Sequence, residues 1–353
     1  APLVVGADLL SASPAVRDDN VELREARQLG IPVVRRAEVL AAIAATKRLI
    51  AVAGTHGKTT TSSMLTLVLI EAGLRPSFLV GADVGDLHTN AVWDVGDWVV
   101  MEADESYGSF EALEPDVTVL TNLEEDHLDH YGTLQGLRGA FERLLNATSL
   151  QVVAGADDPG ARELGQARGA TTVGEAPDAD YRITGLELER SSATFELRGP
   201  EGLRIPLALP VPGRFNARHA AEATVTSLLL GAPPEAAVRA LGRFTGVPRR
   251  WEFRGECNGV TFVDDYAHLP GEVKAALATF RVGQWHRVIA VFQPHRYTRT
   301  AALAAAFADA FSDADVVVVT SVYSAGEPAI PGVSGKLVAD AVAQAQPATP
   351  VYY

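Results

Sequence analysis

Short runs rich in β-branched residues alternate with helical patterns along most of the 353-residue chain. RLIAVAG, SFLVG, DWVVMEA and DVTVLTN have the length of buried strands, and segments such as AALAAAFADAF and KLVADAVAQA have helical character. Strands that alternate with helices form βαβ units, whose strands run parallel. The alternation therefore predicts an α/β fold with a mainly parallel sheet.

The same pattern divides the chain into three predicted domains, at residues 1–47, 48–243 and 244–353. In the first we expect a strand, a helix around 20–29, a strand at IPVV and a helix at RAEVLAAIAA. In the second, YRITGLELE, SATFELRG and LRIPLALP indicate a small antiparallel insertion. APLVVGADLL begins as if inside a strand and ATPVYY stops as one begins, so we expect a fragment cut at both ends.

Composition excludes several classes of protein. The net charge is −14 without a run of Lys or Arg, which argues against a nucleic-acid partner. No apolar run reaches membrane-spanning length, and the start lacks a signal-peptide pattern, so we expect no membrane insertion. The single cysteine, Cys257, excludes a disulfide framework and fits a reducing cytoplasm.

The stretch AVAGTHGKTTTSSM, residues 51–64, ends a predicted strand and opens a predicted helix from about 58 to 72. The usual phosphate-loop pattern requires a glycine where this chain has Val52. Free N–H groups at a helix N-terminus nevertheless bind phosphate, and Gly54 and Gly57 allow close approach. Lys58 would reach the phosphates and Thr59 a magnesium ion. The alternative is a strand-to-helix turn with an incidental GKT.

Acidic residues follow two neighbouring predicted strands. They are Glu102, Asp104 and Glu105 in EADES, and Glu124, Glu125 and Asp126 beside Asn122, His127, Asp129 and His130 in TNLEEDHLDH. The carboxyl ends of parallel strands face one crevice, so both groups would lie beside the loop and supply oxygen ligands to Mg²⁺. Each cluster alone is more typical of a solvated strand end, and the two together beside a phosphate loop favour the metal site. A zinc-protease site is excluded because H-E-x-x-H is missing.

The motifs GTHGKTTT, EADES, TNLEEDHLDHY, RRWEF, VDDYAH and FQPHRYTRT, in this order, resemble those of the Mur peptide ligases, and most closely their alanine-adding branch. The resemblance spans nearly the whole chain. It implies a partial Rossmann-like N-terminal domain for the UDP substrate, a central P-loop ATPase domain and a truncated Rossmann-like C-terminal domain for the amino acid. The shortened loop is itself a trait of this family.

The resemblance also implies an activity. Family members use ATP and Mg²⁺ to join an amine to a carboxylate through an acyl phosphate during peptidoglycan precursor synthesis. For the alanine-adding branch the substrates are UDP-N-acetylmuramate and L-alanine. A cytoplasmic enzyme, monomeric or weakly dimeric, is expected.

Site residues follow from matching motif positions. ATP contacts are implied for Gly54, Thr55, His56, Gly57, Lys58, Thr59, Thr60, Asn216, His219, Arg250 and Asp265, and magnesium ligands for Thr59, Glu102 and His127. Substrate contacts are implied for Ser106, Asn122, Tyr266, His268, Arg296 and Arg299. The catalytic set is Lys58, Glu102, His127, His268 and Arg296. Without the resemblance, Arg296 and Arg299 would be interpreted as surface residues that pair with the acidic excess.

Several positions depart from the family pattern. GRFNARHA keeps Asn216 but has His219 where a second asparagine usually contacts adenine, and DDYAHLPGE has Leu269 in place of a histidine. No lysine lies between His127 and Leu150, so we expect no carbamylated lysine. The glycine-rich UDP loop and the last C-terminal strands are missing, so we expect an incomplete UDP site and poor activity of this piece alone.

Three alternatives remain open. A tripeptide-recycling muramate ligase shares the fold, but FQPHRYTRT favours the alanine-adding branch. Folate polyglutamate synthases lack the match around LDHYGT. A non-catalytic nucleotide-binding paralogue is disfavoured by the intact Lys58, Thr59, Glu102 and His127. Selectivity among alanine, serine and glycine stays undetermined at this level.

Overall fold

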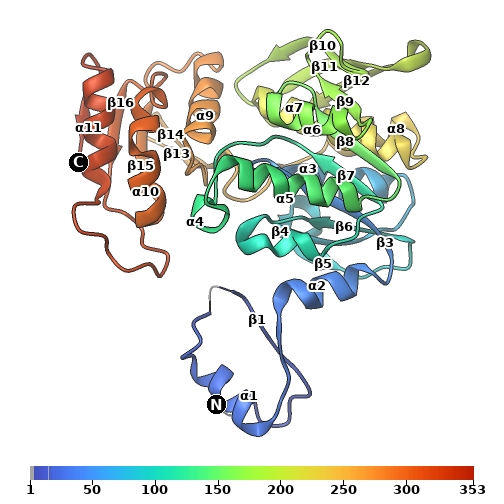
Figure 1. The fold of residues 1–353 in the computed structure, drawn as a ribbon. Coiled ribbons are helices and arrows are strands. Elements are labelled where there is room, and N and C mark those ends of the chain that lie inside the picture. Colours follow the sequence, from blue (N-terminus) through green and yellow to red (C-terminus); the bar gives the residue numbers. More distant parts are fainter. Residues whose placement is uncertain (1–3, 15) are drawn as a thin grey trace.

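The computed structural model describes residues 4–14 and 16–353, which form three groups of elements (Figure 1). The strand expected at the start falls partly on residues 1–3, outside the described residues, and the first strand described is β1 (Leu10–Ala12). Among the described residues, no helix is long and apolar enough to cross a membrane. The predicted domain boundaries stay a prediction.

The N-terminal group is a short α/β unit, as expected. β1 pairs in parallel with β2 (Val33–Arg35), and α1 (Val21–Leu29) connects them. Asn20 caps α1 by accepting hydrogen bonds from two backbone N–H groups, and Gly30 ends the helix in the left-handed conformation. The following helix, α2 (Arg36–Ala44), packs its apolar residues against the core of the central sheet.

The central group is built on one sheet that contains ten of the described strands. In spatial order they are β12 (Arg204–Leu209), β11 (Ala193–Arg198), β10 (Tyr181–Leu188), β9 (Thr171–Gly174), β8 (Gln151–Gly155), β7 (Val117–Leu120), β3 (Arg48–Ala53), β6 (Trp98–Glu102), β4 (Ser77–Val84) and β5 (Thr89–Val92). The seven strands from β10 to β4 pair in parallel, and β5, β11 and β12 are antiparallel to their neighbours. The predicted antiparallel segment is confirmed by β10, β11 and β12, and because β10 also pairs in parallel with β9, this segment extends the main sheet.

Helices cover both faces of this sheet, so its central strands are buried on both sides. In β3, Ile50 and Val52 face the core shared with α3 (Lys58–Glu71), α7 (Arg214–Leu229) and α8 (Pro234–Leu241). Leu49, Ala51 and Ala53 face the other core, which α5 (Leu134–Ala147) and α6 (Pro159–Ala167) close.

The position of β3 defines the active-site edge of the sheet. It lies between β6 and β7, with Ala51 beside Met101 on one side and beside Thr118 on the other. All three strands run in the same direction, so the segments that follow Ala53, Glu102 and Leu120 meet at one edge. Such a point, where the chain order reverses, is where open α/β sheets bind ligands.

The C-terminal group begins with the antiparallel hairpin β13 (Glu252–Cys257) and β14 (Val260–Asp264). A parallel sheet follows, formed by β15 (Ile289–Phe292), β16 (Val316–Val319) and β17 (Val351–Tyr352) with α9 (Pro270–Val282) and α11 (Gly335–Ala345). The helix expected over AALAAAFADAF is wrong in detail. An α-helix, α10, covers Tyr297–Leu303, and residues 304–309 form a 3₁₀-helix.

Candidate active site

The loop after β3 has the shape of a phosphate-binding loop. Gly54 and Gly57 have φ angles of 132° and 81°, which side chains disfavour, and Gly57 caps α3. The Lys58 ammonium donates to the carbonyl oxygens of Gly54 and Thr55 at 2.7 and 3.3 Å and to the Glu105 carboxylate at 2.8 Å. The start of α3 therefore presents its free N–H groups and a lysine at the same point.

A histidine from a distant helix closes over this loop. A Cβ added to Gly57 would lie 2.1 Å from Cε1 of His219, which projects from α7. The His219 ring is buried, and its Nδ1 lies 3.3 Å from the buried Glu222 carboxylate. His219 therefore stands against the phosphate loop, at the position where the family pattern has an asparagine.

The first acidic strand end contacts the loop directly. The Thr59 hydroxyl donates to Glu102 at 3.1 Å, so two of the predicted magnesium ligands are adjacent. Burial raises the pKa of Glu102. Burial disfavours the Lys58 ammonium, but the Glu105 and Asp104 carboxylates outweigh this effect and hold the pKa of Lys58 above its usual value.

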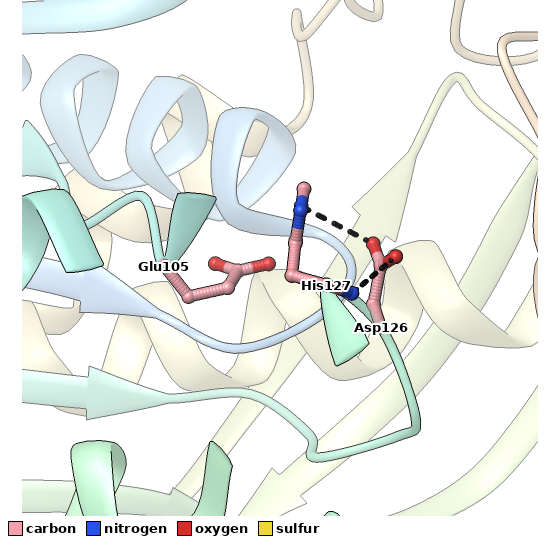
Figure 2. A group of neighbouring side chains, drawn as sticks. All are labelled: Glu105, Asp126 and His127. Atoms are coloured by element: carbon pink, nitrogen blue, oxygen red, sulfur yellow. Dashed lines mark hydrogen bonds and ion pairs between the residues drawn. The ribbon is translucent and has the colours of Figure 1, made fainter. Parts of the chain in front are cut away.

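The two strand ends together bring three possible ligands to one point (Figure 2). Glu105, Asp126 and His127 place one ligand atom each within 4.8 Å of one another. His127 also contacts the Ser106 hydroxyl at 3.1 Å and has a φ of 52°, held by the bond from its N–H to Asp126. Glu105 and Asp126 belong to the acidic strand ends predicted to supply oxygen ligands, but they are not among the ligands that the resemblance implies.

The C-terminal group reaches this cluster through Arg299 of α10. Its guanidinium donates to Asp126 at 2.9 Å and contacts Nδ1 of His295 at 3.0 Å, and the side chains of Arg299 and Asp126 are only 9% and 7% exposed. Burial opposes the charge of Asp126, but Arg299 and His127 outweigh it and lower the pKa. Burial and Arg299 lower the pKa of His295 to about 4.

The other predicted residues of the C-terminal group lie near this ion pair. The rings of Tyr266, His268 and His295 lie 5.1 to 6.2 Å apart between centroids. Nδ1 of His268 lies 2.8 Å from the Tyr266 carbonyl oxygen, and burial lowers the pKa of His268. Arg296 precedes α10 with a φ of 68°.

Three cavities open around these groups. One of about 310 Å³ is lined by His56, Gly57, His219, Arg250 and Asp265. A second, of about 590 Å³, is lined by Arg36 of α2 together with Lys58, Thr59, Glu102 and Tyr266. A third, of about 510 Å³, is lined by Asp126, His127, Arg296 and Arg299. Gly57 and Arg250 line both of the first two cavities, so these meet at the phosphate loop.

Some predicted contact residues already bond to the protein. The Asn122 amide accepts from the N–H of His56 and donates to its carbonyl oxygen, at 2.8 and 3.0 Å. Asn216 donates to the Pro212 carbonyl oxygen and lines a different pocket from His219.

Three further predicted ATP contacts lie beside the first cavity or the phosphate loop. Asp265 accepts from the backbone N–H groups of Trp251 and Ala267. The Thr55 hydroxyl accepts from the N–H of Glu124, and Thr60 lines the first cavity. The ligand-binding roles of all these residues stay predictions.

Comparison with known proteins places this geometry in a family. Residues 1–48 match the Mur ligase family catalytic domain, 52–226 the Mur ligase middle domain and 249–353 the Mur ligase glutamate ligase domain. The UDP-N-acetylmuramate–L-alanine ligase of Arthrobacter sp. is 47% identical over 345 residues, which cover 95% of this chain and 72% of the relative. That of Pelotomaculum thermopropionicum is 43% identical, with 95% and 74% covered.

Solved structures agree with these matches. The crystal structure of the UDP-N-acetylmuramate–alanine ligase of Thermotoga maritima superimposes with a TM-score of 0.81 at 31% identity, covering 98% of this chain and 76% of that one. The matched segments include the phosphate loop, both acidic strand ends and the arginines of α10. The chain therefore belongs to the Mur ligase family.

Proposed function

We propose that this chain is an ATP-dependent ligase that joins the amine of L-alanine to the carboxylate of UDP-N-acetylmuramate, in peptidoglycan precursor synthesis. The observation that carries the proposal is the grouping of three cavities around the phosphate loop and the acidic strand ends: two share Gly57 and Arg250, and the third is lined by Asp126, His127 and the C-terminal arginines. The relatives named above have this activity in their names. A reaction of three substrates needs three such sites around one phosphoryl group.

ATP fits the cavity beside Gly57. Any side chain at residue 57 would clash with His219, so glycine keeps the loop backbone open to the phosphates. The His219 ring offers a surface for the base. The N-terminus of α3 and Lys58 attract the phosphates. Arg250 and Asp265, from the C-terminal group, line the same cavity and would complete it on closure.

Mg²⁺ fits the acidic strand ends, because hydroxyl and carboxylate oxygens are suitable ligands for it. We propose Thr59 and Glu102 for one ion, and His127 with Glu105 and Asp126 for a second. Bound magnesium would offset the negative charge of the phosphoryl group and of the attacking carboxylate. Glu105 is paired with Lys58, and Asp126 is paired with Arg299. These two cationic side chains can therefore hold the site together between turnovers.

The sugar nucleotide fits the largest of the three cavities described above, which is lined by both Lys58 and Arg36. Its carboxylate oxygen would attack the γ-phosphorus, ADP would leave, and an acyl phosphate would form. Lys58 would stabilise the charge on the transferred group. The Ser106 hydroxyl contacts His127, and Asn122 lines the cavity beside Gly57; we propose that both orient the muramate end.

Alanine fits the third cavity, where Arg296 and Arg299 would bind its carboxylate. Its amine would attack the acyl carbon, and the tetrahedral intermediate would release phosphate. His268 suits the role of proton acceptor. The Tyr266 carbonyl only accepts hydrogen bonds, so Nδ1 of His268 carries the proton and Nε2 keeps a free lone pair. Its lowered pKa keeps the ring neutral near pH 7.

The test measures phosphate release by the enzyme expressed from its whole gene. We expect release that requires ATP, Mg²⁺, UDP-N-acetylmuramate and L-alanine together, and assays with glycine and serine in place of alanine determine the amino-acid selectivity. If a preformed tripeptide replaces alanine more efficiently, the enzyme is a recycling ligase. If ATP binds but no amino acid stimulates phosphate release, the chain is a non-catalytic paralogue. We place the reaction in the cytoplasm, and the monomer or weak homodimer is checked by light scattering.

A further inference from the structure

The phosphate loop carries a histidine, His56, whose side chain lies between two carboxylates. Its Nε2 lies 3.1 Å from Glu124, which follows β7, and its Nδ1 lies 3.1 Å from Glu272, in the first turn of α9. The side chains of His56 and Glu272 are 15% and 9% exposed. The imidazole therefore connects the ATP loop to the C-terminal group at a largely buried point.

The shape of the loop does not depend on this side chain. The N–H of His56 donates to Asn122, and its carbonyl oxygen accepts from the Thr121 hydroxyl at 2.7 Å and from Asn122. The backbone at residue 56 is thus fixed by two neighbours of β7. The ring is free to act on something outside the loop.

Glu272 in turn holds the start of α9. Its Oε2 accepts hydrogen bonds from the backbone N–H groups of His268 and Leu269 at 2.8 and 3.2 Å, and Arg250 lies 3.4 Å from its Oε1. Whatever fixes Glu272 therefore also fixes the backbone of His268. His268 is the residue proposed above to accept the proton of the amine.

The start of α9 also lies against Glu124. A Cβ at Gly271 would lie 2.4 Å from Oε2 of Glu124, so the N-terminus of α9 rests directly on that carboxylate. Two carboxylates this close repel each other unless a cation lies between them. A carboxylate lies 3.1 Å from each ring nitrogen of His56: Nε2 is hydrogen-bonded to Glu124, and Nδ1 forms an ion pair with Glu272 without hydrogen-bond geometry. Two carboxylates at this distance favour the imidazolium. Burial lowers the pKa of His56, but Glu124 and Glu272 outweigh it and raise the value to about 9.

We infer that His56 is a positioning residue: its imidazolium joins Glu124 to Glu272 and so couples a filled phosphate loop to the placement of His268 in the amino-acid site. This inference rests on the proposed function for its effect on turnover. Its structural part, the ordering of α9 by nucleotide through His56, is independent of the reaction. The two parts therefore need separate measurements.

The structural part is tested by hydrogen exchange of the backbone amides at residues 268–276. In the unmodified enzyme we expect Mg²⁺ and the β,γ-imido analogue of ATP to slow exchange there. His56→Ala, His56→Asn and Glu272→Gln are compared at a nucleotide concentration that calorimetry shows to be saturating for each variant, and exchange in α9 should then stay fast. His286→Gln and Glu256→Gln remove one exposed histidine and one exposed glutamate of the C-terminal group and should behave as the unmodified enzyme.

The kinetic part separates binding of the two substrates. Loss of a largely buried charge-assisted contact corresponds to about a 10- to 100-fold effect, which we expect in kcat/KM for alanine measured at saturating ATP. His56→Asn and Glu272→Gln should not be additive, because each breaks the same contact. Additive losses, or nucleotide-induced protection of α9 that survives His56→Ala, would overturn the inference. Absence of amino-acid-dependent turnover in the unmodified enzyme would instead refute the proposed function, and the exchange result would still stand.

Discussion

Gly57 offers the sharpest test of how the phosphate loop is built. Its φ of 81° is unfavourable for any other residue, and an added Cβ would lie 2.1 and 2.3 Å from Cε1 and Nε2 of His219. The ring cannot move aside freely, because it is 8% exposed and contacts Glu222. Gly57→Ala therefore meets two separate costs, one in the backbone and one in packing.

The two costs have known sizes. A left-handed backbone costs an alanine about 1–2 kcal/mol, and overpacking a well-packed site costs about 1–3 kcal/mol. We expect Gly57→Ala to lower the free energy of unfolding by about 2–5 kcal/mol, a fall in Tm on the order of 10 °C for the central unit. ATP affinity should fall about tenfold or more, because a shift of only 1.4 kcal/mol suffices.

Differential scanning calorimetry and ATP titration measure both effects. Adding His219→Ala to Gly57→Ala should recover the packing cost, relative to His219→Ala alone, and leave the backbone cost. Gly139→Ala in α5 is a matched control, since it lies in a helix interior without a close backbone neighbour and should stabilise by about 0.5–1 kcal/mol. The reasoning is refuted if Gly57→Ala unfolds at the original temperature and binds ATP as before, or if removal of the ring recovers nothing.

Three further outcomes are expected. Lys58→Ala should reduce phosphate release at least about 100-fold while circular dichroism shows an intact fold, because it removes the cation at the transferred phosphoryl group; turnover like that of the unmodified enzyme would remove Lys58 from the mechanism. Because the pKa of folded His56 is about 9 and its usual value 6.5, it contributes stability that is complete below pH 6.5 and lost as pH rises through 9. Urea unfolding should show this loss, about 3 kcal/mol in full, and His56→Gln should flatten the profile between those values. Arg299→Ala should raise KM for alanine about 100-fold, and an unchanged KM would exclude Arg299 from the amino-acid site. Adding Asp126→Asn to Arg299→Ala should partly restore stability, because it removes the carboxylate that is left unpaired.

Local sequence patterns predicted the elements near the loop well. The strand before Gly54, the helix from Lys58 and the strands before both acidic motifs all occur where the patterns indicated them. These signals are local, because a strand, a glycine turn and a helix N-terminus lie within a few residues of one another. β8, α6 and β9 were not foreseen. β9 is only four residues, TTVG, and is stabilised by its neighbours in the sheet rather than by its own pattern.

Side-chain partnerships could not be predicted from the chain alone. The acidic motifs indicated ligands, but only the fold shows that Glu105 pairs with Lys58 and Asp126 with Arg299. Likewise, Asn122 sits in a recognisable motif, yet its amide is used to hold the backbone of His56. Each partnership joins segments that are distant in sequence, and so depends on how the strands are ordered in the sheet.

The packing of the His219 ring against Gly57 also has a consequence for synthesis of the protein at the ribosome. α3 packs against α7, and almost every side chain from Thr60 to Leu69 is buried. A nascent chain that has completed β3, α3 and β7 but not yet α7 would expose the inner face of α3 and an unsupported loop. Folding intermediates with exposed apolar surface aggregate readily. We therefore expect the growing chain to depend on chaperones until α7 emerges, and to acquire its nucleotide affinity only from that moment.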